Sequence, residues 1–280
     1  MSEARRGDSR RASKLREIRV GVAGWAIPSP VKERFGAEGS ALERYATSLT
    51  AVEINTTFYR MHEPATFARW AASVPKHFRF AVKVAREITH VRRLADCDEP
   101  LARFFEGVRE LGGKLGPILL QLPPSLVYDD GVARTFFHKL RAIHDGAVAC
   151  EPRHGSWFSS AAGRALVEHR IARVAADPAP TTAGSEPGGH DSLAYYRLHG
   201  TPQMYHSSYP RPFLRGLAER LLAERSNAGV WVIFDNTAAG AAAANALALV
   251  ANLSRPASPP RSPRPRRAAP STRSRDIDSA

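Results

Sequence analysis

Cysteine is scarce in this chain, which has only Cys97 and Cys150 among its 280 residues. A scaffold held together by several disulfides is therefore excluded, and the scarcity favours a reducing compartment such as the cytoplasm. No apolar run reaches the roughly 18 residues of a membrane span, so we expect no membrane association. The basic N-terminus is not followed by an apolar stretch, which argues against a secretory signal.

Short motifs that identify a reaction are also missing. The sequence has no Gly-x-Gly-x-x-Gly, Gly-x-Ser-x-Gly, Cys-x-x-Cys or His-Glu-x-x-His pattern. The glycine-rich segment 112–116 precedes an apolar run instead of following one, so it is not a Walker-type phosphate loop. Any chemistry must therefore come from residues that are spread along the chain.

Positive charge is plentiful but unevenly placed. The formal net charge is +13, of which residues 1–19 carry +4 and residues 255–280 carry +5, leaving +4 on the 235 residues between them. Basic tails are suited to non-specific contact with nucleic acid or an acidic surface, although inert, solvated tails are the simpler interpretation. The near-balanced body argues against a long nucleic-acid substrate.

Composition divides the chain into three parts. Residues 1–17 are rich in Arg and Ser, and residues 255–280 are rich in Pro, Arg, Ser and Ala. Both segments have few large apolar residues to bury, so we predict that they are disordered. Residues 18–254 are expected to form the only folded domain.

Within that domain, short apolar runs alternate with helical patterns. We predict eight strands: 19–24, 51–55, 79–84, 116–122, 147–151, 172–176, 194–198 and 230–235. Their starts lie 22 to 37 residues apart, which is the spacing of β-α units in a parallel sheet. Eight such units predict an α/β fold, a single (β/α)₈ TIM-type barrel.

Local signals support several of the intervening helices. Ser40 and Glu43 have the spacing of a capping box, and Pro64 is suited to the first turn of a helix that runs to Val74. A helix opened by Pro100 is expected to end near 112, and helices are also expected over 132–143 and 241–253. Segment 178–191 contains three prolines and three glycines and is predicted to be a long loop.

Polar side chains gather at the carboxyl ends of seven predicted strands, the side where barrel enzymes place their active sites. These residues are Glu53, Asn55, Lys83, Gln121, Glu151, Arg153, Asp177, Arg197, His199 and Asp235. Residues two apart on a strand share a face, so we expect the set to converge. A functional pocket is our preferred interpretation, and a structural polar network that plugs the barrel is the alternative.

Roles can be suggested from side-chain chemistry. The catalytic candidates are Glu53, Glu151, His154, His199 and Asp235. The acids and histidines are suited to proton transfer, although neighbouring cations would neutralise buried carboxylates in a purely structural arrangement. Lys83, Arg153 and Arg197 are suited to clamp a phosphate or carboxylate, and Asp177 and Asp235 to orient these cations. Trp25, Phe58, Tyr59 and Tyr205 are suited to line the pocket or simply to pack.

The cofactor expectation follows from the same residues. The acids and histidines offer oxygen and nitrogen ligands for a divalent metal. Lys83, Arg153 and Arg197 are expected at the same mouth, the end of the barrel formed by the carboxyl ends of the strands, and their charge would oppose metal binding. We therefore expect no cofactor and keep a divalent metal as the alternative.

The strand-end motifs resemble those of the YecE-like proteins, domain-of-unknown-function family 72. The matching segments, in order, are 22–25 (VAGW), 52–59 (VEINTTFY), 80–83 (FAVK), 88–90 (ITH), 115–117 (LGP), 121–124 (QLPP), 151–154 (EPRH), 156–157 (SW), 196–200 (YRLHG) and 234–237 (FDNT). The resemblance covers about residues 18–253 and implies a TIM-type barrel, but it supplies no reaction. By position it also assigns His90 and Asn236 to the shared site, and the two tails fall outside it.

These observations favour an enzyme, a hydrolase, lyase or isomerase acting by acid/base chemistry on a small phosphate-, carboxylate- or sugar-bearing substrate. One alternative is a divalent-metal-dependent phosphodiester or glycosidic hydrolase, which the basic tails would suit to nucleic acid. The other is a barrel that binds a ligand without turning it over. The sequence specifies neither the substrate nor the oligomeric state.

Overall fold

The computed structural model describes residues 18–223 and 229–254, so the predictions for the two tails lie outside the described residues. The described strands are β1 (Ile18–Val22), β2 (Ala51–Ile54), β3 (Arg79–Lys83), β4 (Leu115–Gln121), β5 (Val148–Glu151), β6 (Ala172–Arg173), β7 (Ala175–Asp177), β8 (Gly188–Gly189), β9 (Leu193–Leu198) and β10 (Gly229–Phe234). The α-helices are α2 (Ala41–Ala46), α3 (Pro64–Ser73), α4 (Asp98–Val108), α5 (Asp130–Ile143), α6 (Ser160–Glu168), α7 (Arg211–Ala223) and α8 (Ala241–Leu253). Short turns are η1 (Ser29–Arg34), η2 (Thr56–Phe58), η4 (Arg109–Lys114), η5 (Gly155–Phe158), η6 (Thr182–Ser185) and the π-helical η3 (Glu87–Val91).

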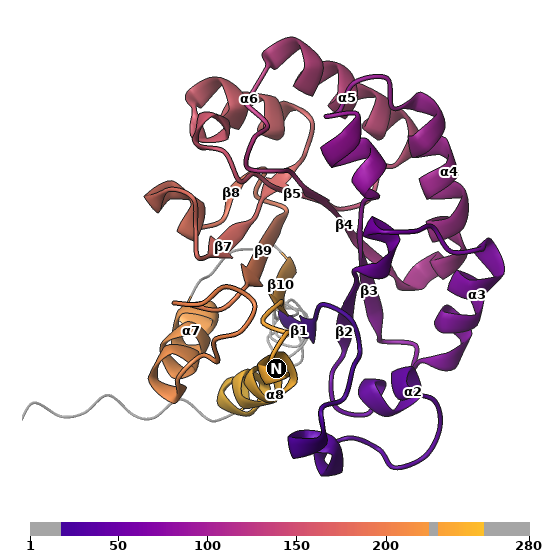
Figure 1. Cartoon of the computed structure of the whole chain (residues 1–280), viewed down its shortest axis with the longest axis vertical. Helices are drawn as coiled ribbons and strands as arrows, with labels where there is room; N and C mark the ends of the chain where they lie inside the picture. Colours follow the sequence, from indigo (N-terminus) through magenta and orange to yellow (C-terminus); the bar gives the residue numbers. More distant parts are fainter. Residues whose placement is uncertain (1–17, 224–228, 255–280) are drawn as a thin grey trace, which may run out of the picture.

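The strands form two sheets that stand next to each other (Figure 1). One has the order β1-β10-β9-β7, and the other has the order β2-β3-β4-β5-β6-β8. All pairings are parallel except that of the two-residue β8 with β6. A parallel bridge from Ala23 to Glu53 links β1 to the second sheet.

The predicted barrel is confirmed as a mixed α/β, TIM-barrel-like fold, but the prediction of one closed barrel is not. Strand six is broken at Val174, so that β6 pairs with β5 while β7 pairs with β9 on the other sheet. Val174 itself donates its backbone N–H to Cys150. One extended segment, 172–177, therefore serves both sheets, and the hydrogen-bonded ladder changes partners there instead of running on without interruption.

Most of the helix predictions are confirmed. Ser40 and Glu43 form a reciprocal capping box at the start of α2, and Pro64 is the first residue of α3. The helix containing Pro100 is α4, which starts two residues earlier than predicted. Segment 178–191 lacks an α-helix, as predicted, but η6 and β8 give it some regular structure.

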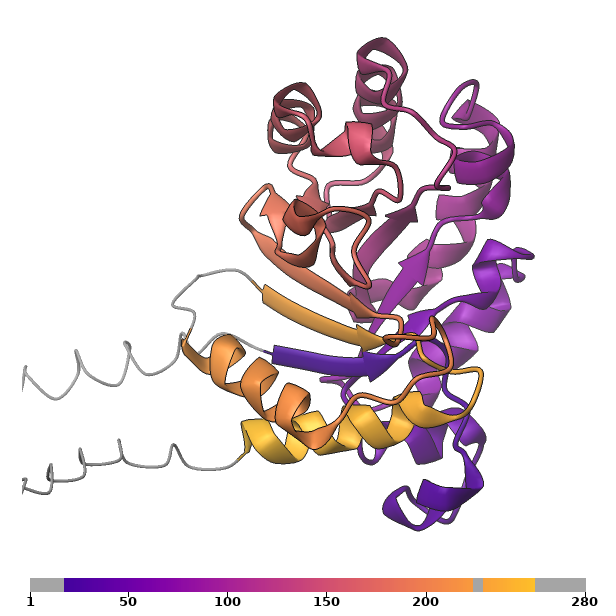
Figure 2. The same ribbon diagram turned by 60° about the vertical axis from the view of Figure 1, so that its left-hand side comes forward.

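Two apolar layers hold the fold together. Helices α2–α6 lie outside the strands, and α7 and α8 lie side by side, with α8 against β1 and β10 (Figures 1 and 2). The larger core packs these helices onto the sheets. None of the described helices is long and apolar enough to cross a membrane.

A second, smaller core fills the space that the strands enclose. It consists of Ala51, Ala81, Leu119, Ala149, Ala172, Val174, Leu193, Tyr195, Trp231 and Ile233. The small alanines leave room for two large rings, those of Tyr195 and Trp231, which stack with centroids 6.2 Å apart. Because side chains two apart share a face, the next inward residues toward the strand ends are Glu53, Lys83 and Arg197. The apolar interior thus ends directly below a charged layer.

Candidate functional site

Arg197 lies at the centre of a buried charged cluster at the strand ends. It is 0% exposed, as is Glu53, and Glu151 is 1% exposed. Its Nε and Nη2 donate to the two carboxylate oxygens of Glu53 at 3.1 and 2.7 Å. Nη1 donates to Glu151 at 2.7 Å and Nη2 to Asp235 at 2.9 Å. One guanidinium from β9 thus gathers carboxylates from β2 and β5 and from the residue after β10.

His199 links two of these carboxylates. Its Nε2 lies 2.7 Å from Oε1 of Glu151, and its Nδ1 lies 3.1 Å from Oδ2 of Asp235. A neutral imidazole has one N–H donor, whereas the imidazolium has two, and an ionised carboxylate can only accept. The two short contacts are therefore those of an imidazolium held between two carboxylates.

Electrostatics support this charge state. Burial opposes the ionisation of Glu151, but Arg197 and His199 outweigh it and hold the pKa of this carboxyl below its usual value. The pKa of Asp235 is lowered in the same way, since burial is outweighed chiefly by Arg197. Burial would lower the pKa of His199, yet the neighbouring Glu151 and Asp235 raise it. These shifts favour the ionised forms of Glu151, Asp235 and His199.

Tyr195 is a member of the cluster that the sequence did not suggest. Its hydroxyl donates to Oε2 of Glu53 at 2.8 Å, and the residue is 0% exposed. Burial and the nearby Glu53 raise the pKa of Tyr195 well above its usual value, so the phenol stays protonated. The spacing 195, 197, 199 on one strand face contained the signal, but a tyrosine in an apolar strand is more often a core residue.

Arg153 and Lys83 are the cations closest to the mouth. Arg153 donates to Glu151 at 3.2 Å and to the carbonyl of Pro178 at 3.3 Å, and its side chain is 14% exposed. Lys83 is 7% exposed and places its Nζ over the ring of Phe58, 4.0 Å from the centroid. The ring of His90, carried by the π-helical η3, contacts the same phenylalanine edge-on at 4.9 Å. Arg153 and Lys83 therefore form the cationic side of the site.

Not every predicted residue joins the cluster. His154 caps η5 by accepting the backbone N–H of Ser156, and the side chain of Gln121 donates to the neighbouring carbonyl of Leu122. Asp177 accepts the backbone N–H of His199 through its main-chain carbonyl. Among the described residues, these three side chains make no hydrogen bond to the cluster. Their proposed roles therefore stay predictions.

Other predicted residues surround the mouth. Trp25 packs edge-on against Trp70, and Tyr59 is 78% exposed beside Phe58. Asn236 donates to the carbonyl of Ser207 and to Asn245. Two buried amide oxygens, Oδ1 of Asn55 and Oδ1 of Asn236, have no hydrogen-bond partner among the described residues. A buried acceptor without a donor is costly, and the described residues supply no donor to either oxygen.

Tyr205 lies next to His199 on the loop that follows β9. Its ring meets the imidazole edge-on at 5.7 Å and the residue is 44% exposed. Its backbone has φ of 67°, in the left-handed region that is rare for a bulky residue. Bonds from its N–H to His199 and from the N–H of Ala238 to its carbonyl hold that conformation in place.

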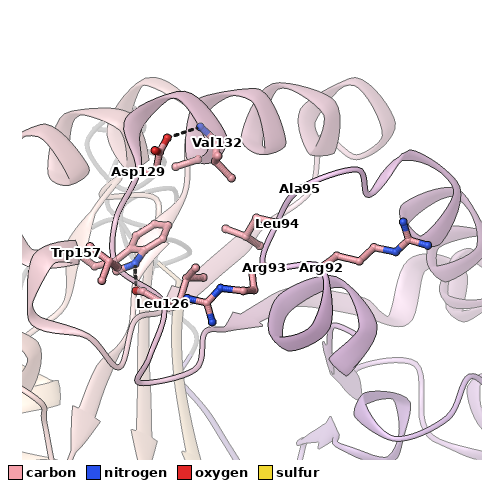
Figure 3. Close-up of a pocket in the computed structure, with 10 residues that line it drawn as sticks. Arg92, Arg93, Leu94, Ala95, Leu126, Asp129, Val132 and Trp157 are labelled. Carbon is pink, nitrogen blue, oxygen red and sulfur yellow. Dashed lines mark hydrogen bonds between the residues drawn. The ribbon is translucent and has the colours of Figure 1, made fainter.

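A separate cavity of about 390 Å³ lies away from this cluster (Figure 3). It is lined by Arg92, Arg93, Leu94, Ala95, Leu126, Val127, Asp129, Val132, Ala133 and Trp157. In Figure 3, Leu94 faces Trp157 across the space, while the guanidinium of Arg92 points away from it. None of the predicted site residues lines this cavity.

The charged cluster does not have the form of a metal site. Arg197 lies among the carboxylates, where a metal would need to sit to bind all three. Across residues 18–223 and 229–254, no group of three or more His, Cys, Asp or Glu side chains is arranged to hold a metal ion. The donor set as arranged therefore fits a guanidinium better than a divalent cation.

Comparison with known proteins identifies curated relatives of part of the chain. The chain is 28% identical to UPF0759 protein YecE of Escherichia coli K12 over 172 residues, which cover 59% of this chain and 61% of that protein. It is 25% identical to UPF0759 protein YunF of Bacillus subtilis over 149 residues, covering 51% and 52%. A further YecE match, to Escherichia coli O157:H7, is 34% identical but covers only 38% of either chain. The chain thus spans less than two thirds of the curated relatives it matches.

Solved structures support the same fold. A DUF72 family protein from Thermotoga maritima superposes with a TM-score of 0.71 at 24% identity, covering 85% of this chain and all of the other. A DUF72 family protein from Enterococcus faecalis gives 0.70 at 24% identity, covering 86% and 97%. The family model described as "Protein of unknown function DUF72" matches residues 19–269, which extends past residue 253, where the motif resemblance ended. The chain therefore belongs to the DUF72 family.

Proposed function

We propose that this protein is an enzyme that acts on a small polar or anionic substrate by acid/base chemistry at the carboxyl ends of its strands. The observation that carries the proposal is the imidazolium of His199 between Glu151 and Asp235, in a cluster that is almost fully buried. Buried ion clusters cost desolvation energy, and apolar residues of similar volume often stabilise a core equally well. A reactive role gives this costly arrangement a purpose.

Each group has a distinct part in the proposed mechanism. Arg197 has four donor contacts, all to carboxylates, so its part is to orient Glu53, Glu151 and Asp235. The exchangeable proton is on His199, and it moves when a substrate oxygen replaces one carboxylate at a ring nitrogen. This step leaves the proton on the substrate and a neutral imidazole on the enzyme.

Substrate binding falls to the groups that are less fully engaged. Arg153 and Lys83 present positive charge at the mouth and suit a phosphate or carboxylate. The unpaired amide oxygens of Asn55 and Asn236 suit hydroxyl or amine donors, such as those of a sugar. Together they favour a ligand that carries both an anionic group and hydroxyl groups.

We also propose a cytoplasmic location. Both cysteines are buried free thiols, and burial raises the pKa of Cys97 to about 11, which keeps that thiol protonated and unreactive. Two cysteines that form no disulfide with each other are compatible with a reducing compartment.

The test is a turnover screen of phosphate-, carboxylate- and sugar-bearing compounds by NMR, comparing wild type with His199→Gln. His138→Gln is the matched control because His138 is exposed on α5. We expect a compound that wild type and His138→Gln convert equally, and that His199→Gln converts at least about 100-fold more slowly. Equal conversion by His199→Gln would disprove the acid/base assignment.

The same screen separates the two alternative functions. Ligand binding without conversion, with affinity lost in Arg153→Ala, would indicate a binding protein. Conversion that a chelator abolishes and added divalent ions restore would indicate a metal-dependent hydrolase. The position of Arg197 among the carboxylates gives no support to the latter.

A further inference from the structure

Lysine is rare in this chain. Of its 40 basic residues only six are lysines, at 14, 32, 76, 83, 114 and 139, and the rest are arginines. Both residues carry a positive charge, but only the lysine amine can lose its proton and act as a nucleophile. Lys83 is the lysine at the mouth of the strands, next to the charged cluster, where an arginine would serve equally well to bind an anion.

The side chain of Lys83 is fixed by its surroundings. Its backbone carbonyl accepts the hydroxyl of Thr57 at 2.6 Å, and that hydroxyl also contacts the carbonyl of Ile54 at 3.1 Å. Phe58, the residue after Thr57, lies beneath the amine, with Nζ of Lys83 4.0 Å from its ring centroid. The turn η2 therefore positions both the lysine backbone and the apolar surface on which its amine rests.

The amine itself is not tied to an acceptor. The described residues provide no ion pair and no hydrogen bond to Nζ of Lys83, whereas Lys139 pairs with Asp98 and Lys114 donates to two backbone carbonyls. Lys83 as a whole is only 7% exposed, so its stem is buried, while its amine has no acceptor among the described residues.

We propose that Lys83 is a nucleophile that forms a Schiff base with the carbonyl group of an anionic substrate. The proposal rests on the proposed function and narrows its substrate class to aldehydes or ketones that carry an acidic group. In the step, Nζ bonds to the carbonyl carbon, the C–O bond breaks, and the carbonyl oxygen leaves as water with two protons of the ammonium. The product is a protonated imine, so the positive charge is conserved and no oxidant or reductant takes part.

The electrostatic setting agrees with this role. Burial, together with the positive charge of Arg197, lowers the pKa of Lys83 to about 8 from 10.5. The fraction of neutral amine at pH 7 is then on the order of 100-fold higher than for a lysine at the ordinary value. His90, which also contacts Phe58, adds no further positive charge next to Lys83. Burial and the charge of Lys83 lower the pKa of that histidine to about 4, so its ring is neutral.

The experiment uses the full chain, glyoxylate as the carbonyl probe and cyanoborohydride to reduce any imine, at pH 7. Peptide mapping by mass spectrometry gives the rate of carboxymethylation at each lysine. We expect Lys83 to be labelled at least about tenfold faster than the exposed Lys32 and Lys76, as a lowered amine pKa predicts. Labelling of Lys83 at the rate of the exposed lysines, or more slowly, would overturn the proposal.

Two variants complete the test. Lys83→Arg keeps the positive charge at the mouth and should lose only the fast-labelled peptide, whereas Lys76→Arg should leave the labelling of Lys83 unchanged. Fast labelling that persists in Lys83→Arg belongs to another residue and would also overturn the proposal. The labelling measures amine reactivity and requires no turnover. Slow labelling of Lys83 would therefore leave the acid/base role of His199 intact. Failure of the turnover screen would likewise leave the labelling result interpretable.

Discussion

Two levels of the enclosed interior are built by the same strands and differ completely in chemistry. The lower level packs as an apolar core that includes Ile233 and the ring of Tyr195, and only the Tyr195 hydroxyl reaches up to Glu53. Two residues further along the same strands, Arg197 and Asp235 belong to an ion cluster. Apolar burial favours folding, whereas buried ions at best recover their desolvation cost. The lower level therefore favours folding, and the upper level is the part whose desolvation cost the proposed function would explain.

The largest expected effect comes from removing the cation that holds the upper level together. Arg197→Met leaves three buried carboxylates without their shared partner, and we expect a loss of about 3–5 kcal/mol in the free energy of unfolding. Urea denaturation measures this loss. The variant should regain stability as the pH is lowered, because protonation relieves the unpaired carboxylates. A variant as stable as wild type would show that the cluster is not held by Arg197.

The dependence of stability on pH tests the charge of His199. Its folded pKa is raised above the ordinary 6.5, so its contribution is complete below about pH 6.5 and is lost as pH rises through the folded pKa. On the acid side, Glu151 and Asp235 have lowered pKa values, so their contribution is present above 4.5 and 3.8 and is lost as pH falls through the folded values.

We therefore expect the unfolding free energy of wild type to fall between pH 6.5 and 8, by about 1.4 kcal/mol for each unit by which the pKa of His199 is raised. His199→Gln should lack this fall. The comparison stops at pH 8, because the lowered pKa of Lys83 makes the unfolding free energy rise with pH above that value. A decline that His199→Gln retains would assign the effect to another group.

The smallest effect is expected at the lower level. Ile233→Val removes one buried methylene from a fully buried side chain and should cost about 0.5–1.5 kcal/mol. The pH dependence between 6.5 and 8 should match that of wild type, as measured by urea denaturation at each pH. If Ile233→Val changed that pH dependence, the two levels would be coupled and the comparison between them would not hold.

The sequence predicted the main architecture because its signals were local. Apolar runs gave the strand positions to within about two residues, and the capping box at Ser40 and the proline at 64 marked helix starts that the structure confirms. The break at Val174 was not predictable, since it depends on which strands pair across the ring. Pairing between distant segments leaves no periodic pattern in the sequence.

The sequence placed several members of the charged cluster at the same strand ends, but Tyr195 and the hydrogen bonds within the cluster were not predicted. Alternation along the strands was enough to bring Glu53, Glu151 and Arg197 to one end. Nothing in the sequence indicated that His199 would use both ring nitrogens or that Tyr195 would donate to Glu53. Such details depend on distances across the enclosed space, which the residue order along the chain does not encode.

The segment 172–177 has one further consequence. Its first half sets the alignment of β5, which carries Glu151, and its second half sets that of β9, which carries Arg197. On this side of the fold a single short stretch of chain therefore keeps the two sheets in phase, as the Ala23–Glu53 bridge links them on the other side. One residue added at Val174 would turn its inward side chains outward and put the sheets out of step. Glu151 and Arg197 would then miss each other, although neither of their strands had been altered.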